Sequence, residues 1–198
     1  MTWLRIDERK EAVNALEKTY RFILETHEDP YNWKWVIIAL HNSTQAFMVL
    51  ALMGTASLNV IKEKEKWLKA IQLGTEYPER QKLLNFLKLY KDFKSKNCMM
   101  QNTYCKFFPD SKKIDESMEK LNDIRNNFVH FIPCNWSIEI ALFPEVCKQV
   151  LLFVDFLIHE SGNVRFYYND ESEKADLAKL IAKIRSELEM LELECKAK

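Results

Sequence analysis

The chain has 198 residues, 47% of them hydrophobic, and its 29 basic and 29 acidic side chains leave a formal net charge of zero. This length suits one domain, residues 1–198, with a substantial core, and the balanced charge argues against a broad, non-specific nucleic-acid binder. The five cysteines form no CxxC pair, so neither a disulfide framework nor a zinc site is expected.

The apolar stretches and the breaker residues indicate a helical protein without membrane contact. The N-terminus mixes charges of both signs and has no apolar run, and no apolar stretch reaches the ~18 residues of a membrane span. We therefore expect a cytoplasmic protein. Only three glycines and five prolines occur, which leaves long segments free to form helices.

The first third of the chain predicts two long helices and one short helix. The first covers residues 3–27 and has Thr2 as its cap. Its inward face repeats at helical spacing and contains Ile6, Val13, Leu16, Tyr20 and Ile23. The second covers residues 31–53 and is followed by Gly54, a residue suited to ending a helix. The charged stretch over residues 59–73 predicts a shorter helix.

The middle of the chain predicts a third long helix over residues 79–96, then a loop over residues 97–110. The inward face of this third helix contains Leu83, Leu84, Leu87 and Tyr90. A fourth long helix covers residues 111–131, and Pro133 prevents much continuation.

The C-terminal part predicts a short extended stretch over residues 136–142 and a fifth helix that begins near Pro144 and stops before Gly162. A last helix covers residues 170–196. Its apolar residues alternate in steps of four and three and are Leu177, Ile181, Ile184, Leu188, Leu191 and Cys195. Such a seam requires a partner helix, from the same chain or from a second copy. The predicted fold class is all-α.

The fourth helix carries the most informative chemistry. Its seam steps by four and three through Ile114, Met118, Leu121, Arg125, Phe128 and Ile132. Arg125 stands where the pattern calls for a leucine, and an arginine on a buried seam requires a carboxylate, carbonyl groups or a phosphate as its partner. His130 follows at the helix end, with Asn126 one turn before it on the same side.

The angular spacing of these residues predicts a site shared between two chains. At ~100° per residue, Arg125 and His130 lie about 140° apart around the helix axis, with Asn122 and Asn126 between them. One helix therefore does not direct both side chains at the same atom. Two antiparallel copies bring the arginine of one beside the histidine of the other, so we expect a homodimer with a composite site.

Two blocks of the sequence resemble the HEPN superfamily. The stretch 125–130, RNNFVH, matches the Arg-x4–6-His motif of HEPN domains, including a polar residue directly after the arginine. The longer block over residues 121–139 is similar to the same region of uncharacterised bacterial HEPN-type proteins, and residues 41–54, HNSTQAFMVLALMG, are similar to their second helix. The resemblance implies a HEPN-like helical bundle, here with an additional C-terminal helix.

For function, the resemblance implies a metal-independent endoribonuclease that acts as a toxin or a phage-defence effector. RNA carries its own nucleophile, the 2′-hydroxyl, so the protein has to hold the phosphate and move protons. Arg125 would bind the phosphate, His130 would serve as general acid or base, and Asn126 would orient either one. Asn122 and His41 would support them. No metal and no cofactor are expected, and the expected partners are RNA and a cognate antitoxin or regulatory protein.

Other interpretations of the same residues remain open. A HEPN domain that has lost catalysis serves as a dimerisation, RNA-binding or partner-binding module, and a generic helical interaction protein is the third alternative. Arg125 would then be a structural residue bonded to a buried carboxylate, and His41 a satisfied core histidine. Arg21 and His27 also fit the Arg-x4–6-His spacing, but Phe22 rather than a polar residue follows that arginine.

Overall fold

The computed structural model of the chain shows a helical bundle. The residues that it describes are 2–54, 57–76, 80–95, 105–130, 133, 135–166 and 170–197. Within them the regular elements are α1 (Glu8–Glu25), α2 (Trp33–Leu52), α3 (Lys64–Leu73), α4 (Phe86–Lys94), α6 (Lys112–Val129), α7 (Leu142–His159), α8 (Asp170–Ala197) and two short 3-10 turns. Among these residues a single isolated bridge, between Ile61 and Leu83, is the extent of β pairing. The all-α prediction is confirmed.

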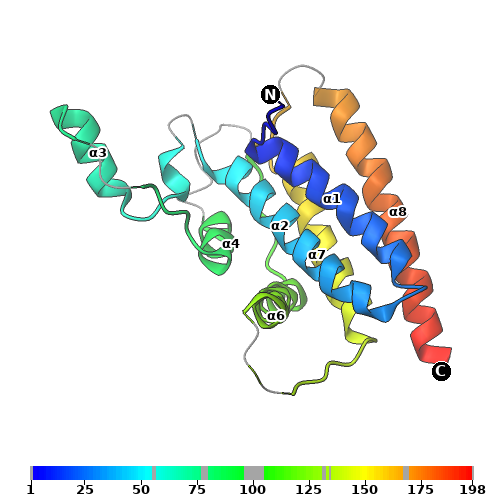
Figure 1. The fold of residues 1–198 in the computed structure, drawn as a ribbon. Coiled ribbons are helices and arrows are strands. Elements are labelled where there is room, and N and C mark those ends of the chain that lie inside the picture. Colours follow the sequence, from blue (N-terminus) through cyan, green and yellow to red (C-terminus); the bar gives the residue numbers. More distant parts are fainter. Residues whose placement is uncertain are drawn as a thin grey trace.

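Helix α2 is the centre of the bundle. It packs against α1, α4, α6 and α7, while α8 covers α7 and α1 on the far side (Figure 1). Helix α3 projects away from the bundle, and Ala70 is its one buried residue. The stretch Pro30–Leu52 is long and apolar enough to cross a membrane by length and composition, with an 18-residue window of mean hydropathy 1.5, and 72% of that window is buried inside the structure.

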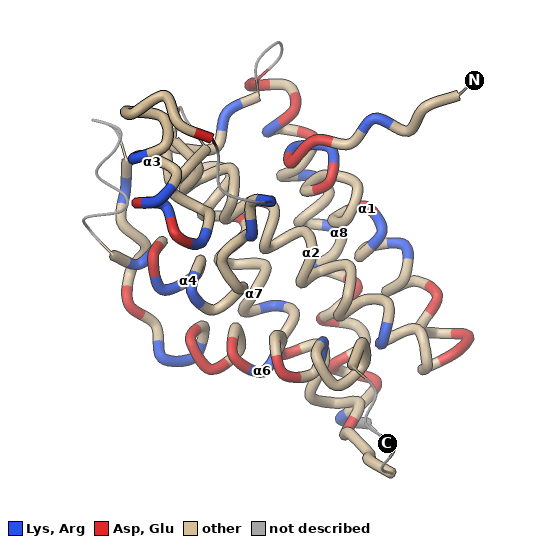
Figure 2. Tube along the Cα trace, turned by 60° about the vertical axis from the view of Figure 1, so that its left-hand side comes forward, with Lys and Arg blue, Asp and Glu red and all other residues tan. Residues whose placement is uncertain are grey.

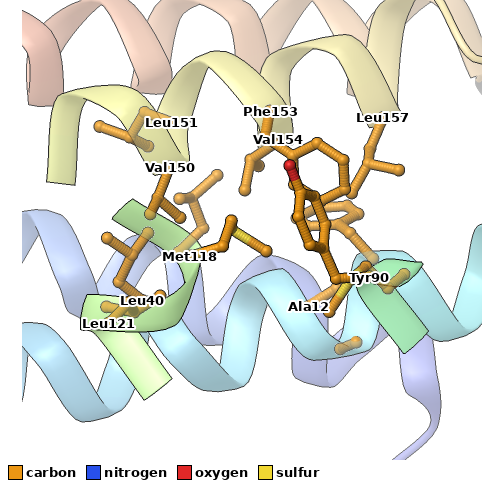
Figure 3. Packing of buried hydrophobic residues seen from close by; sticks show 14 of the residues in the cluster. Ala12, Leu40, Tyr90, Met118, Leu121, Val150, Leu151, Phe153, Val154 and Leu157 are labelled. Carbon is orange, nitrogen blue, oxygen red and sulfur yellow. The ribbon is translucent and has the colours of Figure 1, made fainter. Parts of the chain in front are cut away.

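The core is rich in aromatic side chains that meet around Phe153 of α7. The rings of Tyr90, Phe93 and Phe108 all meet that ring edge-on, with centroids 5.0, 5.2 and 5.1 Å away. Figure 3 shows Tyr90 of α4 against Phe153, and Met118 of α6 between α7 and α2. Full burial of one such side chain stabilises the fold by about 1.5–3 kcal/mol. This cluster joins α4 and the segment around Phe108 to α7, while α6 packs against α7 and α2 beside it.

The start of the first helix differs from the prediction. Helix α1 begins at Glu8 rather than at Trp3, because the Asp7 carboxylate accepts hydrogen bonds from the backbone N–H groups of Arg9 (3.1 Å) and Lys10 (2.8 Å). An aspartate at the N-cap position stabilises a helix that starts at the next residue, and this favours a start at Glu8 over an earlier one. Ile6 therefore lies outside the helix and is 65% exposed, so its assignment to the inward face was wrong.

The predicted third helix is also shorter than expected. Helix α4 begins at Phe86, and the Asn85 side chain caps it by accepting from the backbone N–H of Lys88 at 2.8 Å. The preceding residues pair instead with the segment before α3: Leu84 N–H donates to the Val60 carbonyl at 2.8 Å. Leu83 is consequently 39% exposed rather than inward. The predicted ends of this helix, residues 79 and 96, lie outside the described residues.

Two further expectations concern the C-terminal part. Residues 136–141 are not extended in a sheet, and α7 begins at Leu142, two residues before Pro144. The seam of α8 is buried against α1 and α7 of the same chain through Leu177, Ile181, Ile184, Leu188 and Leu191. Arg185 of α8 also donates a hydrogen bond to Asp155 of α7 at 2.9 Å. The partner helices of this seam therefore belong to its own chain.

An ion-pair network joins α4 to α6. Asp115 accepts hydrogen bonds from the Tyr90 hydroxyl (2.6 Å) and from the Lys94 ammonium (2.9 Å to each oxygen). Burial opposes ionisation of Asp115, but the hydrogen bonds from Tyr90 and Lys94 outweigh it and hold the pKa of this carboxyl below its ordinary value. Burial of the Tyr90 hydroxyl, together with its hydrogen bond to the Asp115 carboxylate, raises the pKa of Tyr90.

Replacing Asp115 should therefore destabilise the fold in a pH-dependent way. Asp115→Asn should lower the free energy of unfolding by about 1 kcal/mol at neutral pH, a modest loss because the carboxylate is partly exposed. A depressed folded pKa gives stability that is present above the unfolded pKa of about 3.8 and is lost as the pH falls through the lower folded pKa, so the difference between the two proteins should shrink from neutral to strongly acidic pH. Urea unfolding at both pH values measures this. Asp110→Asn, at a 93% exposed side chain near the same lysine, should change little.

Candidate functional site

Arg125 lies on α6 where the buried seam of that helix reaches the edge of the bundle. Leu121, one turn earlier, is fully buried, and the Arg125 side chain is half-buried. One guanidinium nitrogen, Nη1, donates a hydrogen bond to Asn126 Oδ1 at 3.1 Å, whereas Nε is buried without a hydrogen-bond partner. Among the described residues no carboxylate lies within ion-pair distance of this arginine. The interpretation of Arg125 as a structural residue held by a buried carboxylate therefore has no support in the described part of the chain.

Arg125 opens into a pocket of about 470 Å³ between α2, α6 and the start of α4. Its polar lining comes from His41, Gln45, Asn85, Asn122, Arg125 and Asn126. Phe86 and nearby leucines form the apolar part of the wall. The described lining residues include one permanent charge, the guanidinium, surrounded by amide side chains. A pocket of this composition favours an anion that also accepts hydrogen bonds.

His41 is the buried histidine of this pocket. Its side chain is 2% exposed and its ring stacks on Phe86, with centroids 4.1 Å apart and planes 22° apart. Burial first, and then the positive charge of Arg125, lower the pKa of His41 to about 4, while the side chains of Asn122 and Asn42 oppose the shift. The imidazole is therefore neutral at pH 7.

No hydrogen bond of good geometry reaches either ring nitrogen of His41 among the described residues, although the side chains of Asn122 and Asn42 lie close enough to favour the protonated ring. Buried polar atoms in folded proteins are nearly always well hydrogen-bonded, so this imidazole is an exception. A bound ligand can supply the missing partner, because the histidine lines the pocket that Arg125 faces.

His130 takes a different position. It is the C-cap of α6, its backbone N–H donates to the Asn126 carbonyl at 2.8 Å, and its side chain is exposed. It does not line the pocket that contains Arg125. The fold therefore gathers Arg125, Asn126, Asn122 and His41 and leaves His130 on the surface, in agreement with the angular separation on the helix.

Gln45, Asn85 and Phe86 are among the lining residues that were not identified from the sequence as site residues. Gln45 lies one helical turn after His41 on α2, and that i, i+4 spacing was the available signal. Asn85 is the cap of α4, and Phe86 provides the stacking surface. Neither had a sequence signal, because both reach the pocket only through the packing of α4 against α2.

The competing pair, Arg21 and His27, does not form a comparable site. Arg21 is exposed and its Nε donates to Glu25 of the same helix at 3.0 Å. His27 lies 3.8 Å from Glu187 and 3.9 Å from Glu194, both on α8. Each of the two side chains thus lies beside a carboxylate at the surface, as expected for residues with a structural role.

In the view of Figure 2 the described basic and acidic residues lie interspersed. Lys and Arg alternate with Asp and Glu along the outer helices, as Figure 2 shows for α1. Many of these charges are neighbours on the same helix, such as Lys88 and Asp92 at 2.6 Å. An anionic ligand would therefore be held at a local point such as Arg125 rather than over a broad basic surface.

Comparison of the chain with protein-family models, with curated proteins and with solved structures gives no match. The geometry of the pocket and the two sequence blocks at residues 41–54 and 121–139 are therefore the basis for a functional hypothesis. Both blocks contribute to the same pocket, His41 and Gln45 from the first and Asn122, Arg125 and Asn126 from the second.

Proposed function

We propose that this protein is a metal-independent endoribonuclease of the HEPN type, a cytoplasmic toxin or phage-defence effector that acts as a homodimer. The observation that carries the proposal is Arg125: a half-buried guanidinium with an unpaired Nε and no carboxylate among the described residues, in a pocket lined by amides and a neutral histidine. A phosphate diester is an anion that satisfies both the charge and the hydrogen-bonding groups of such a pocket.

In the proposed reaction, the 2′-oxygen of one nucleotide attacks the adjacent phosphorus and the bond from phosphorus to the 5′-oxygen of the next nucleotide breaks. The proton of the 2′-hydroxyl passes to a general base, and a general acid returns a proton to the departing 5′-oxygen. The products are a 2′,3′-cyclic phosphate and a 5′-hydroxyl. Arg125 stabilises the charge that develops on the phosphate oxygens, and His130 transfers protons, the usual task of a histidine near neutral pH.

His41 contributes to this reaction in its neutral form. A neutral imidazole has one N–H donor and one acceptor nitrogen, so His41 can donate to a phosphate oxygen without adding a second positive charge beside Arg125. Stacking on Phe86 fixes its ring plane. Asn126 holds Nη1 of the guanidinium and so fixes the direction in which the rest of the fork points.

The position of His130 outside the pocket makes a second chain part of the proposal. In an antiparallel pair of α6 helices, His130 of one chain would approach Arg125 of the other, and two such sites would form around the two-fold axis. A cognate antitoxin or regulatory protein would act by covering this cleft or by preventing the dimer.

The same position of His130 favours a second candidate function. If no partner chain brings a histidine to Arg125, the pocket can bind an anion, but the histidine it already contains, His41, is buried and with a pKa of about 4 is a weak base. The protein would then be a catalytically inactive HEPN domain that serves as a dimerisation, RNA-binding or partner-binding module.

Cleavage of a mixed single-stranded RNA pool in the presence of EDTA separates the two functions. We expect the wild-type protein to cleave it and to leave 2′,3′-cyclic phosphate ends, identified because phosphatase removes the phosphate only after acid has opened the ring to a monophosphate. Addition of Mg²⁺ should change the rate little. Cleavage that requires Mg²⁺, or RNA that binds without being cut at any protein concentration, would contradict the ribonuclease and favour the binding module.

A further inference from the structure

A second pocket adjoins the one that contains Arg125. It has a volume of about 480 Å³ and lies between the start of α1, α2 and the paired segments around Ile61 and Leu83. Gln45 and Leu83 line both pockets, so the two form neighbouring parts of one groove. The walls of the second part are largely aliphatic, with Val49 and Met53 from α2.

The two parts of this groove carry opposite charge. Among the described lining residues, the first part has Arg125 as its permanently charged side chain, and the second has Glu8 and Glu11. Neither glutamate has an ion pair with a described residue. The groove therefore offers a cation at one end, an aliphatic wall in the middle and carboxylate acceptors at the other end. His41, 2% exposed and without a well-formed hydrogen bond at either ring nitrogen, lies at the cationic end beside Arg125.

We propose that this groove binds one nucleotide of the RNA, with its phosphate at Arg125 and its base in the second pocket, and that it prefers a base with an exocyclic amine. The assignment of the phosphate to Arg125 rests on the proposed function. The planar base lies against Val49 and Met53, the wall that excludes water from its faces. The carboxylates of Glu8 and Glu11 repel the phosphate from their end and so give the nucleotide one orientation in the groove.

The acidic end also distinguishes between bases. Cytosine presents an amine, N4, where uracil presents a carbonyl oxygen, O4, and a carboxylate accepts from the amine but repels the carbonyl oxygen. Adenine presents an amine in the same manner. We take Glu11 of α1 for this contact because, unlike Glu8, it also borders the neighbouring hollow that shares Asn42 with the second pocket. The groove should therefore select cytidine and adenosine over uridine.

Calorimetric titration with the 3′-monophosphates of cytidine, adenosine and uridine tests this selection, since the protein cannot cleave these probes. We expect cytidine and adenosine monophosphates to bind about tenfold more tightly than uridine monophosphate. Inorganic phosphate should compete with all three. Glu11→Gln should reduce the difference between cytidine and uridine to about threefold or less, because an amide can turn its donor towards O4. Glu189→Gln, at an exposed glutamate of α8, is the matched control and should leave the preference intact.

Equal affinity for cytidine and uridine monophosphates, or a preference that survives Glu11→Gln, would overturn the proposal. So would undiminished binding of all three by Arg125→Ala. The experiment also separates this inference from the ribonuclease activity. If the protein discriminates among the nucleotides but never cleaves RNA, the binding groove is supported and the ribonuclease activity is contradicted. If it cleaves RNA but binds the three nucleotides equally, the reverse holds.

Discussion

Replacing either His130 or Arg125 by alanine should lower the rate of RNA cleavage by about 10²–10⁴-fold. The histidine variant loses proton transfer, and the arginine variant loses the stabilisation of charge on the phosphate. If both side chains act in one transition state, the double variant should be only slightly slower than either single variant, because catalytic groups that act as a unit have strongly non-additive effects. Initial rates on a fluorescently labelled RNA with EDTA present measure all three.

The chain provides matched controls for these variants. Arg21→Ala and His27→Ala remove a second pair at Arg-x4–6-His spacing, and both residues lie at the surface beside carboxylates. We expect each to retain wild-type cleavage. Since Arg125 is half-buried, thermal unfolding of the Arg125→Ala protein should accompany the rate measurement. A variant that keeps its unfolding temperature but loses activity supports a catalytic role. If the Arg125 and His130 variants cleave RNA as fast as the Arg21 and His27 variants, the assignment of the catalytic site is wrong.

Mixing the two inactive variants should restore activity. In a dimer whose sites each combine Arg125 of one chain with His130 of the other, a heterodimer of Arg125→Ala and His130→Ala chains has one complete site and one empty site. Random exchange of equal amounts gives half heterodimers, so about a quarter of the sites should be intact, and the mixture should recover about a quarter of wild-type cleavage. Each starting variant should be at least about 25-fold slower than that mixture, which makes the recovery easy to measure.

The control for this experiment is a mixture of Arg125→Ala chains with chains that carry both substitutions, in which no arrangement completes a site. Light scattering should report dimers in each mixture. Dimers that exchange subunits without any recovery of cleavage would show that each site uses residues of one chain. His41, which is already beside Arg125, would then be the histidine to replace next.

The sequence was most informative where hydrophobic periodicity alone determines structure. The ends of α2 and α6 lie within two residues of their predicted positions, because each is long and has a continuous buried face. The predictions were wrong where a capping side chain or a distant segment decides the boundary. Asp7 shortens α1, and the pairing of Leu84 with Val60 replaces the first turns of the predicted third helix.

The candidate site was predictable to a similar extent. Arg125 was visible as the one polar residue on an apolar seam, and Asn126 and Asn122 follow from its helix. The neutral state of His41 was not predictable, because it depends on burial and on the charge of an arginine 84 positions away in the sequence. For His130, only its angle from Arg125 around the helix could be predicted from the sequence. The position of His130 outside the pocket was not predictable, because it depends on where α6 ends.

The buried, unpaired imidazole of His41 has a consequence for how the pocket responds to acid. Burial is the larger reason and the charge of Arg125 the smaller reason why the pKa of His41 lies near 4, so an anion that neutralises Arg125 raises that pKa part of the way towards its ordinary value. Between the pKa of the empty pocket and that of the occupied pocket, the occupied pocket holds a proton that the empty pocket does not. Binding is then coupled to proton uptake, and affinity for the anion rises as the medium becomes mildly acidic. A drop in pH would thus act on this protein as a positive effector of ligand binding, with His41 as the residue that senses it.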